Sequence, residues 1–94
     1  MMLGFMCVVL AVHGQSANDL FAEGLALEKA FKVEEALAKY EAVLQRQPTH
    51  EEALWHASRM ESNVGGHLKE KSAKRTHYEK AQVYAQKAIQ LNPQ

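Results

Sequence analysis

Apolar residues recur every three or four positions along most of the chain, which is the spacing of one face of an α-helix. β-branched residues are scarce and apolar and polar positions do not alternate, so the sequence predicts no strand. Pro48 interrupts the pattern, because proline removes a backbone donor and disfavours helix at the residue before it. We expect an all-α chain with helices over 17–30, 33–46, 50–63 and 69–91, the third ending at Gly65-Gly66.

The two halves of the chain match each other at fixed offsets, as expected of helical repeats. The first helix of each expected pair matches at an offset of 34 residues, at which Gly24 corresponds to Ser58. The second helix matches at an offset of 45 residues, at which Pro48 corresponds to Pro93. The difference between the offsets places 11 extra residues inside the second pair.

The extra residues fall in a segment that is charged nearly throughout. We expect the first half of the fourth helix, residues 67–80, to project into solvent. The rest of this helix should dock on the other helices through Val83, Tyr84, Ala88 and Ile89.

Six positions carry a resemblance to a known repeat family: Leu20, Gly24, Leu27, Ala36, Tyr40 and Pro48. At these spacings, residues 17–50 resemble one complete tetratricopeptide (TPR) repeat. Residues 51–93 resemble a second repeat that departs from the pattern, with Ser58 for the glycine, Glu61 where Leu27 stood, and the insertion. The resemblance implies a short α-solenoid of antiparallel helix pairs, with one repeat over 15–50 and a second over 51–94 that carries an insertion around 65–80. The arrangement is similar to that of exported bacterial proteins of this family.

In tetratricopeptide proteins the first helix of each pair lines a concave groove that binds peptides, so the resemblance implies a binding face. Its positions here are Asn18, Phe21, Leu25, Glu28, Glu52, Trp55, Arg59 and Ser62. Phe21 stacked with Trp55, and Leu25 with Arg59, would form a platform of two aromatic rings beside a guanidinium. Aromatic residues and arginine are the residues that most often carry interface energy. The alternative is that Phe21 and Trp55 belong to the core.

Residues 1–12 are uncharged and apolar, and we expect a signal peptide over 1–14 that is removed after Gly14. The apolar run is shorter than the about 20 residues that span a bilayer, so we expect no permanent membrane span. No Lys or Arg precedes the run, which leaves a buried first helix as the alternative. The only cysteine, Cys7, lies in this segment, so the processed chain would have no thiol. The expected location is exported, in the periplasm or secreted.

The net charge is zero, but it is divided unevenly. Residues 15–64 carry a net charge of −4 and residues 65–94 a net charge of +4, which suits head-to-tail self-association. A basic extension comprises Lys69, Lys71, Lys74, Arg75 and Lys80. It is interpreted as a solvated helix face, with contact to an acidic protein or to lipid headgroups as the alternative. Nucleic-acid binding is not expected, because the tyrosines are not arranged among the basic residues as a stacking platform.

Catalytic and metal-binding patterns are missing from the sequence. The segment that begins at His50 approaches a helical zinc motif, but Leu54 stands where the second histidine is required. Neighbouring acids such as Glu34 and Glu35 lie at expected helix starts, where they complement the helix dipole. We therefore predict no enzyme activity, no cofactor and no metal.

The sequence thus predicts a protein–protein interaction scaffold that binds a peptide or protein partner on its concave face. Two alternatives remain. In the first, the chain is the N-terminal structural segment of a longer helical solenoid and has no ligand of its own. In the second, it contacts anionic lipid through the basic helix.

Overall fold

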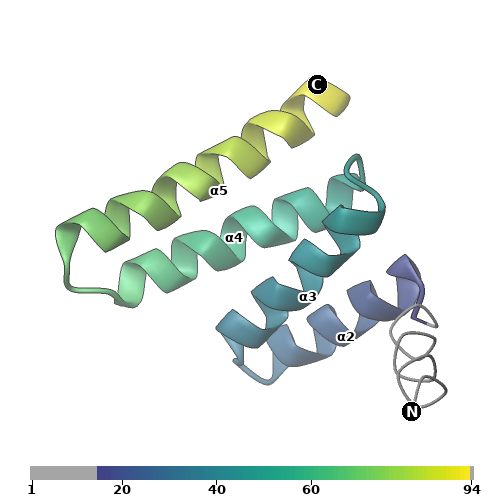
Figure 1. Ribbon diagram of the computed structural model, residues 1–94, viewed down its shortest axis with the longest axis horizontal. Helices are drawn as coiled ribbons and strands as arrows, with labels where there is room; N and C mark the ends of the chain where they lie inside the picture. Colours follow the sequence, from purple (N-terminus) through teal and green to yellow (C-terminus); the bar gives the residue numbers. More distant parts are fainter. Residues whose placement is uncertain (1–14, 94) are drawn as a thin grey trace, which may run out of the picture.

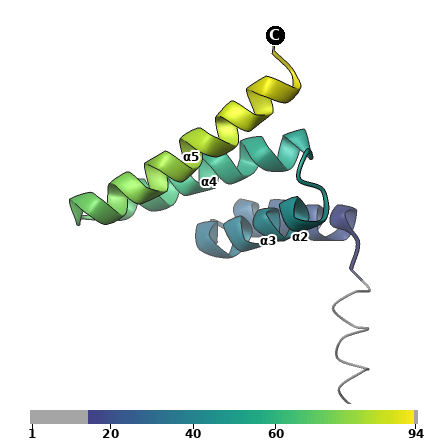
Figure 2. The same cartoon turned by 45° about the horizontal axis from the view of Figure 1, so that its top comes forward.

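The computed structural model describes residues 15–93, and every regular element in this range is an α-helix. The helices are α2 (Ala17–Lys29), α3 (Val33–Arg46), α4 (Glu51–His67) and α5 (Lys71–Leu91). Helices α2 and α3 form one antiparallel hairpin, and α4 and α5 form a second (Figure 1). Helix α3 packs against α4, so the hairpins stack as two layers (Figure 2). The predicted all-α fold of stacked helix pairs is confirmed.

Three helices begin with a side chain that accepts a hydrogen bond from the first turn. At the start of α2, Ser16 Oγ accepts from the Asp19 N–H at 3.1 Å and the Asp19 carboxylate accepts from the Ser16 N–H at 3.5 Å, which makes a capping box. At the start of α4, His50 Nδ1 accepts from the Ala53 N–H at 3.0 Å. The Glu70 carboxylate caps α5 in the same way. These caps place each start within two residues of its predicted position.

The predicted break at Gly65-Gly66 is wrong. Helix α4 continues through both glycines and ends at His67. A Cβ atom on Gly65 would lie 2.9 Å from Cε1 of Tyr78, so this glycine lets the Tyr78 ring of α5 approach closely. Glycine serves both helix ends and close approaches, and the sequence pattern does not separate the two roles.

The 11 extra residues of the second hairpin form helical turns instead of a loop. Helices α2 and α3 have 13 and 14 residues, whereas α4 and α5 have 17 and 21. The loops that close the two hairpins, 30–32 and 68–70, have the same length. Helix α4 is therefore longer by about one turn and α5 by about two turns, and the second hairpin extends beyond the first (Figure 1).

The first half of α5 packs against α4 and does not project into solvent as predicted. The carboxylate of Glu61 on α4 is 1% exposed, and His77 Nδ1 of α5 lies 2.6 Å from Glu61 Oε1. Tyr78 covers Gly65 one residue farther along. The prediction failed because the insertion lengthens both helices of the hairpin, so that the added turns of α5 have a partner on α4.

The second half of α5 docks through small side chains. Ala88 and Ala81 are buried and Tyr84 is half-buried, which confirms the predicted docking of Tyr84 and Ala88. Val83 and Ile89 were expected to dock with them and instead are 58% and 50% exposed. They lie on other sides of α5, because Val83 is adjacent in sequence to Tyr84 and Ile89 to Ala88, and adjacent residues do not share a helix face.

The hydrophobic core connects both hairpins. Its buried residues are Ala36, Leu37, Tyr40, Ala57, Met60 and Val64 in one cluster and Ala17, Leu20, Val43 and Ala53 in the other. A Cβ atom on Gly24 would lie 2.6 Å from Cε1 of Tyr40, so the glycine makes room for the ring. In the second hairpin Ser58 takes the place of Gly24, and its hydroxyl donates to the Ala81 carbonyl at 2.7 Å.

Two glycine substitutions should change stability in opposite directions. Gly24→Ala inserts a methyl group against the buried Tyr40 ring and should lower the free energy of unfolding by about 1–3 kcal/mol. Gly66→Ala meets only the Tyr78 hydroxyl, at 3.9 Å, and should raise it by about 0.5–1 kcal/mol, because alanine favours a helix interior. Urea unfolding measures both values. Loss of stability in Gly66→Ala would contradict a continuous α4.

The buried pair of Glu61 and His77 should show strong coupling. His77→Leu leaves the Glu61 carboxylate buried without its partner and should cost about 3–5 kcal/mol. Glu61→Leu introduces the residue found at the equivalent Leu27, and the double variant should recover most of the loss. A double-mutant cycle by thermal or urea unfolding measures the coupling, and additive effects would show that the pair does not hold α5 on α4.

Candidate functional site

Aromatic rings meet at the junction of α2, α3 and α4, which is formed by Phe21, Tyr40, His50 and His56. The ring centroid of Phe21 lies 5.6 Å from that of Tyr40, 5.1 Å from that of His50 and 5.5 Å from that of His56. His56 meets Phe21 edge to face, with 82° between the ring planes. Aromatic pairs favour this geometry, so the contact holds the first helices of the two hairpins together.

The carboxylate of Glu28 lies next to these rings, on the side toward the protein surface. Glu28 on α2 accepts a hydrogen bond from the Tyr40 hydroxyl at 2.6 Å and lies 3.0 Å from His56 Nδ1. Arg59 of α4 forms an ion pair with the second oxygen of Glu28. One carboxylate of α2 therefore binds side chains of α3 and α4.

These contacts shift two pKa values. Burial acts to raise the pKa of Glu28, but hydrogen bonds from Tyr40, His56 and Arg59 and the charge of Arg59 outweigh it and lower the pKa below its ordinary value. Burial, together with the hydrogen bond to Glu28, raises the pKa of Tyr40. The carboxylate is thus held ionised and the phenol protonated, which is the combination that the hydrogen bond requires.

The predicted groove residues divide into two groups. Phe21, Leu25 and Glu28 are half-buried, whereas Asn18, Glu52, Trp55, Arg59 and Ser62 are exposed. Phe21 was expected to stack with Trp55, and Leu25 with Arg59. In the structure, Phe21 contacts the rings of Tyr40 and two histidines, and Arg59 pairs with Glu28. Phe21 therefore belongs to the junction, and the exposed ring on this face is Trp55, at 43% exposure. The role of these residues in binding stays a prediction.

Sequence reasoning missed His56 as part of this junction. His56 stands six residues after His50, and this spacing gives no sign of a carboxylate supplied by another helix. The sequence gives the residue types of Glu28 and Tyr40, but their contact depends on the register between α2 and α3.

Most of the predicted basic extension lies on α5. Lys69 precedes the helix, and Lys71, Lys74, Arg75 and Lys80 follow in its first half. Lys71, Lys74, Arg75 and the partly exposed Tyr78 line a shallow pocket of about 350 Å³, together with Glu79 and Gln82. Because α4 supports this part of α5, the cations occupy a fixed surface.

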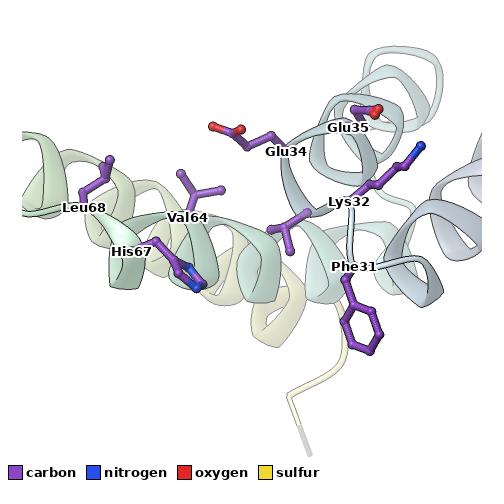
Figure 3. A pocket seen from close by; sticks show the side chains of 8 residues that line it. Phe31, Lys32, Glu34, Glu35, Val64, His67 and Leu68 are labelled. Carbon is purple, nitrogen blue, oxygen red and sulfur yellow. The ribbon is translucent and has the colours of Figure 1, made fainter.

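A larger pocket, of about 430 Å³, opens where the long hairpin passes the end of the short one (Figure 3). Val64 and Leu68 contribute apolar walls from α4 and the residue after it. Phe31, Glu34 and Glu35 come from the loop of the first hairpin and the start of α3. The sequence pattern gives no sign of this pocket, because the pocket depends on where the 11 extra residues lie.

Each described histidine contacts a protein group, two of them within one helical turn and two of them on another helix. His50 caps α4, His67 Nδ1 lies 2.7 Å from the Asn63 carbonyl, and His56 and His77 pair with carboxylates. Between residues 15 and 93 there is no group of three or more His, Cys, Asp or Glu placed to hold a metal ion.

The fold and this surface define a class of protein: a small domain of stacked helical hairpins with exposed aromatic and basic faces. The profile of one family, described as Regulator of microtubule dynamics protein 1-3, matches residues 19–94, and the chain belongs to this family. No curated protein and no solved structure matches the chain.

The family match corrects the resemblance drawn from the sequence. The chain is not a tetratricopeptide-family protein, and its likeness to exported bacterial members of that family is wrong as well. Apart from Pro48, the positions that carried the resemblance are those at which helices pack closely, and close packing is not specific to one family. Small residues such as glycine and alanine are favoured wherever two helices approach closely, whatever the family.

The predicted signal peptide and Cys7 lie in residues 1–14, outside the described residues. Within residues 15–93, none of the helices has both the length and the apolar character needed to cross a membrane.

Replacement of Glu28 should weaken the domain and flatten its pH dependence. The folded-state pKa of Glu28 is lowered, so its stabilising effect is complete above its unfolded value near 4.5 and is lost as the pH falls through the folded value. Glu28→Gln should lower the free energy of unfolding at pH 7 by about 1.5–3 kcal/mol. The difference between variant and wild type should shrink in acid. Urea unfolding from pH 7 to pH 3 measures it, with exposed Glu79→Gln as the control.

Proposed function

We propose that this chain is a non-catalytic module that binds another polypeptide. The observation that carries the proposal is the exposed indole of Trp55, on the face of α4 opposite the core. Glu52, Arg59 and Ser62 share this face, because residues three, four and seven positions away lie on one side of a helix. An exposed tryptophan next to an arginine is typical of the centre of a binding surface.

The support beneath this face favours binding. Arg59 is held by Glu28, which in turn accepts from Tyr40 in the core. A side chain that is already fixed loses less conformational entropy when a partner binds. The partner should therefore meet Trp55 and the guanidinium in a preformed arrangement, and it should present an apolar side chain near a polar or acidic group.

Family membership indicates which partner to test first. The family is described as a regulator of microtubule dynamics, so the polypeptide is a microtubule or a protein that acts on one. This step rests on the family description, whereas the binding face rests on the geometry of α2 and α4.

Binding without catalysis is supported by the use of the carboxylates. Glu28 and Glu61 are taken up in structural pairs, and Glu51 and Glu52 stand in the first turn of α4 where they complement the helix dipole. The predicted absence of cofactors and of nucleic-acid binding stays part of the proposal. The predicted export rests on residues 1–14 and stays a separate prediction, because a microtubule lies inside the cell.

A second candidate is contact with an anionic partner through α5. Lys71, Lys74 and Arg75 form a compact positive surface beside Tyr78. An acidic protein or anionic lipid headgroups would fit it, and such binding weakens at high salt because exposed charges are screened. A solenoid segment with no ligand of its own is the outcome if neither face binds.

Trp55→Ala should weaken binding to microtubules without unfolding the domain. Loss of a central aromatic contact costs about 2 kcal/mol or more, which corresponds to roughly 30-fold weaker binding. Cosedimentation of the full chain with polymerised tubulin, at a series of tubulin concentrations, measures the affinity. Circular dichroism checks that the variant keeps its helices.

Ile89→Ala serves as the matched control, because Ile89 is 50% exposed and lies on α5. It should bind like the wild type. Equal binding by Trp55→Ala would remove the α4 face from consideration. If that binding also weakens with salt and with Lys74→Ala and Arg75→Ala, the α5 surface is the contact; no sedimentation with microtubules at all would contradict the proposed partner.

A further inference from the structure

Phe31 adopts a backbone conformation that the fold alone does not favour for phenylalanine. It follows the end of α2 with a φ of 62°, in the left-handed region. The Phe31 N–H donates to the Glu28 carbonyl at 3.0 Å and the Lys32 N–H donates to the Leu27 carbonyl at 2.9 Å, which makes a Schellman motif. Glycine is the usual residue at this position because it has no Cβ.

The Phe31 side chain also gains nothing from burial, since it is 90% exposed. Figure 3 shows the ring standing out from the loop at one side of the 430 Å³ pocket. A strained backbone combined with an exposed aromatic ring does not stabilise the monomer, and strain of this kind is found at functional sites. A contact with another molecule that buries the Phe31 ring would account for phenylalanine at this position.

The pocket beside Phe31 has an apolar floor, and its rim carries two carboxylates and one cation, Lys32. Val64 and Leu68 line it from the overhanging end of α4, and Glu34 and Glu35 line it from the start of α3. Neither glutamate takes part in an ion pair with another residue between 15 and 93. Apolar side chains next to cations would complement this pocket.

Such a surface exists on α5 of the same chain. Lys80, Val83, Lys87 and Leu91 follow one another at spacings of three, four and four residues, so they form one stripe along the helix. Val83 is 58% exposed and Leu91 is 45% exposed. The two lysines, too, lack an ion-pair partner among the residues that the structure describes.

We propose that the pocket beside Phe31 binds the α5 stripe of a second copy of this chain. Val83 and Leu91 contact Phe31 and the apolar floor, and the lysines face Glu34 and Glu35. The division of charge supports this choice of occupant, because residues 15–64 carry −4 and residues 65–94 carry +4. Since the two surfaces are different, each copy offers one of each and the contact is heterologous.

Phe31→Gly tests the proposal, because it should not harm the fold. Glycine relieves the left-handed backbone, so the variant should unfold at a higher temperature than the wild type while it loses self-association. Sedimentation velocity of the full chain, at concentrations from about 10 µM to 1 mM, suits a contact of this small size. The wild type should gain mass with concentration at low salt and lose it at high salt.

The matched variant on the other surface is Val83→Ser with Leu91→Ser, and it should also remain monomeric. A mixture of this variant with Phe31→Gly restores one intact pocket and one intact stripe, so the mixture should form dimers that neither variant forms alone. A monomeric wild type, association that Phe31→Gly leaves unchanged, or a mixture that stays monomeric would each overturn the proposal. Binding of another protein in place of a second copy would appear as the first of these outcomes.

Discussion

The position of the Tyr40 ring above Gly24 is the constraint on which the rest of the structure depends. The ring is fully buried, and only a residue without Cβ lets α2 come close enough to cover it. This approach brings the Tyr40 hydroxyl to Glu28, which then binds His56 and Arg59 of the next hairpin. A single steric fit inside the first hairpin thereby sets the register between the two hairpins, because hydrogen bonds tolerate little displacement of their partners.

The second hairpin solves the same packing problem in a different way. Ser58 replaces the glycine and donates to the Ala81 backbone, and a second glycine and tyrosine, Gly65 and Tyr78, meet in the added turns. Glu61 would be unfavourable alone in this interior, but His77 from the same added turns lies next to it. The extra length and the buried carboxylate therefore depend on each other, and together they make α5 a rigid support for its cations.

The sequence predicted the elements better than their contacts. The second helix, 33–46, has the predicted bounds, since Pro48 and the periodic apolar positions both reflect local backbone and burial requirements. Gly65, Val83 and Ile89 were misassigned because each depends on which face of a neighbouring helix lies opposite. On the candidate face, Trp55 and Arg59 lie on the exposed side of α4, whereas the contact of His56 with Glu28 spans 28 residues and has no local signal.

The unequal length of the hairpins links the fold to association. Two hairpins of equal length would cover each other's ends, but the longer second one overhangs the first and leaves Val64 and Leu68 beside a pocket. A loop that served only to close the first hairpin would carry glycine at residue 31, because glycine stabilises this turn and exposes no apolar surface. Phenylalanine does the opposite on both counts. Monomer stability therefore does not account for this residue, and an intermolecular contact at the overhang does.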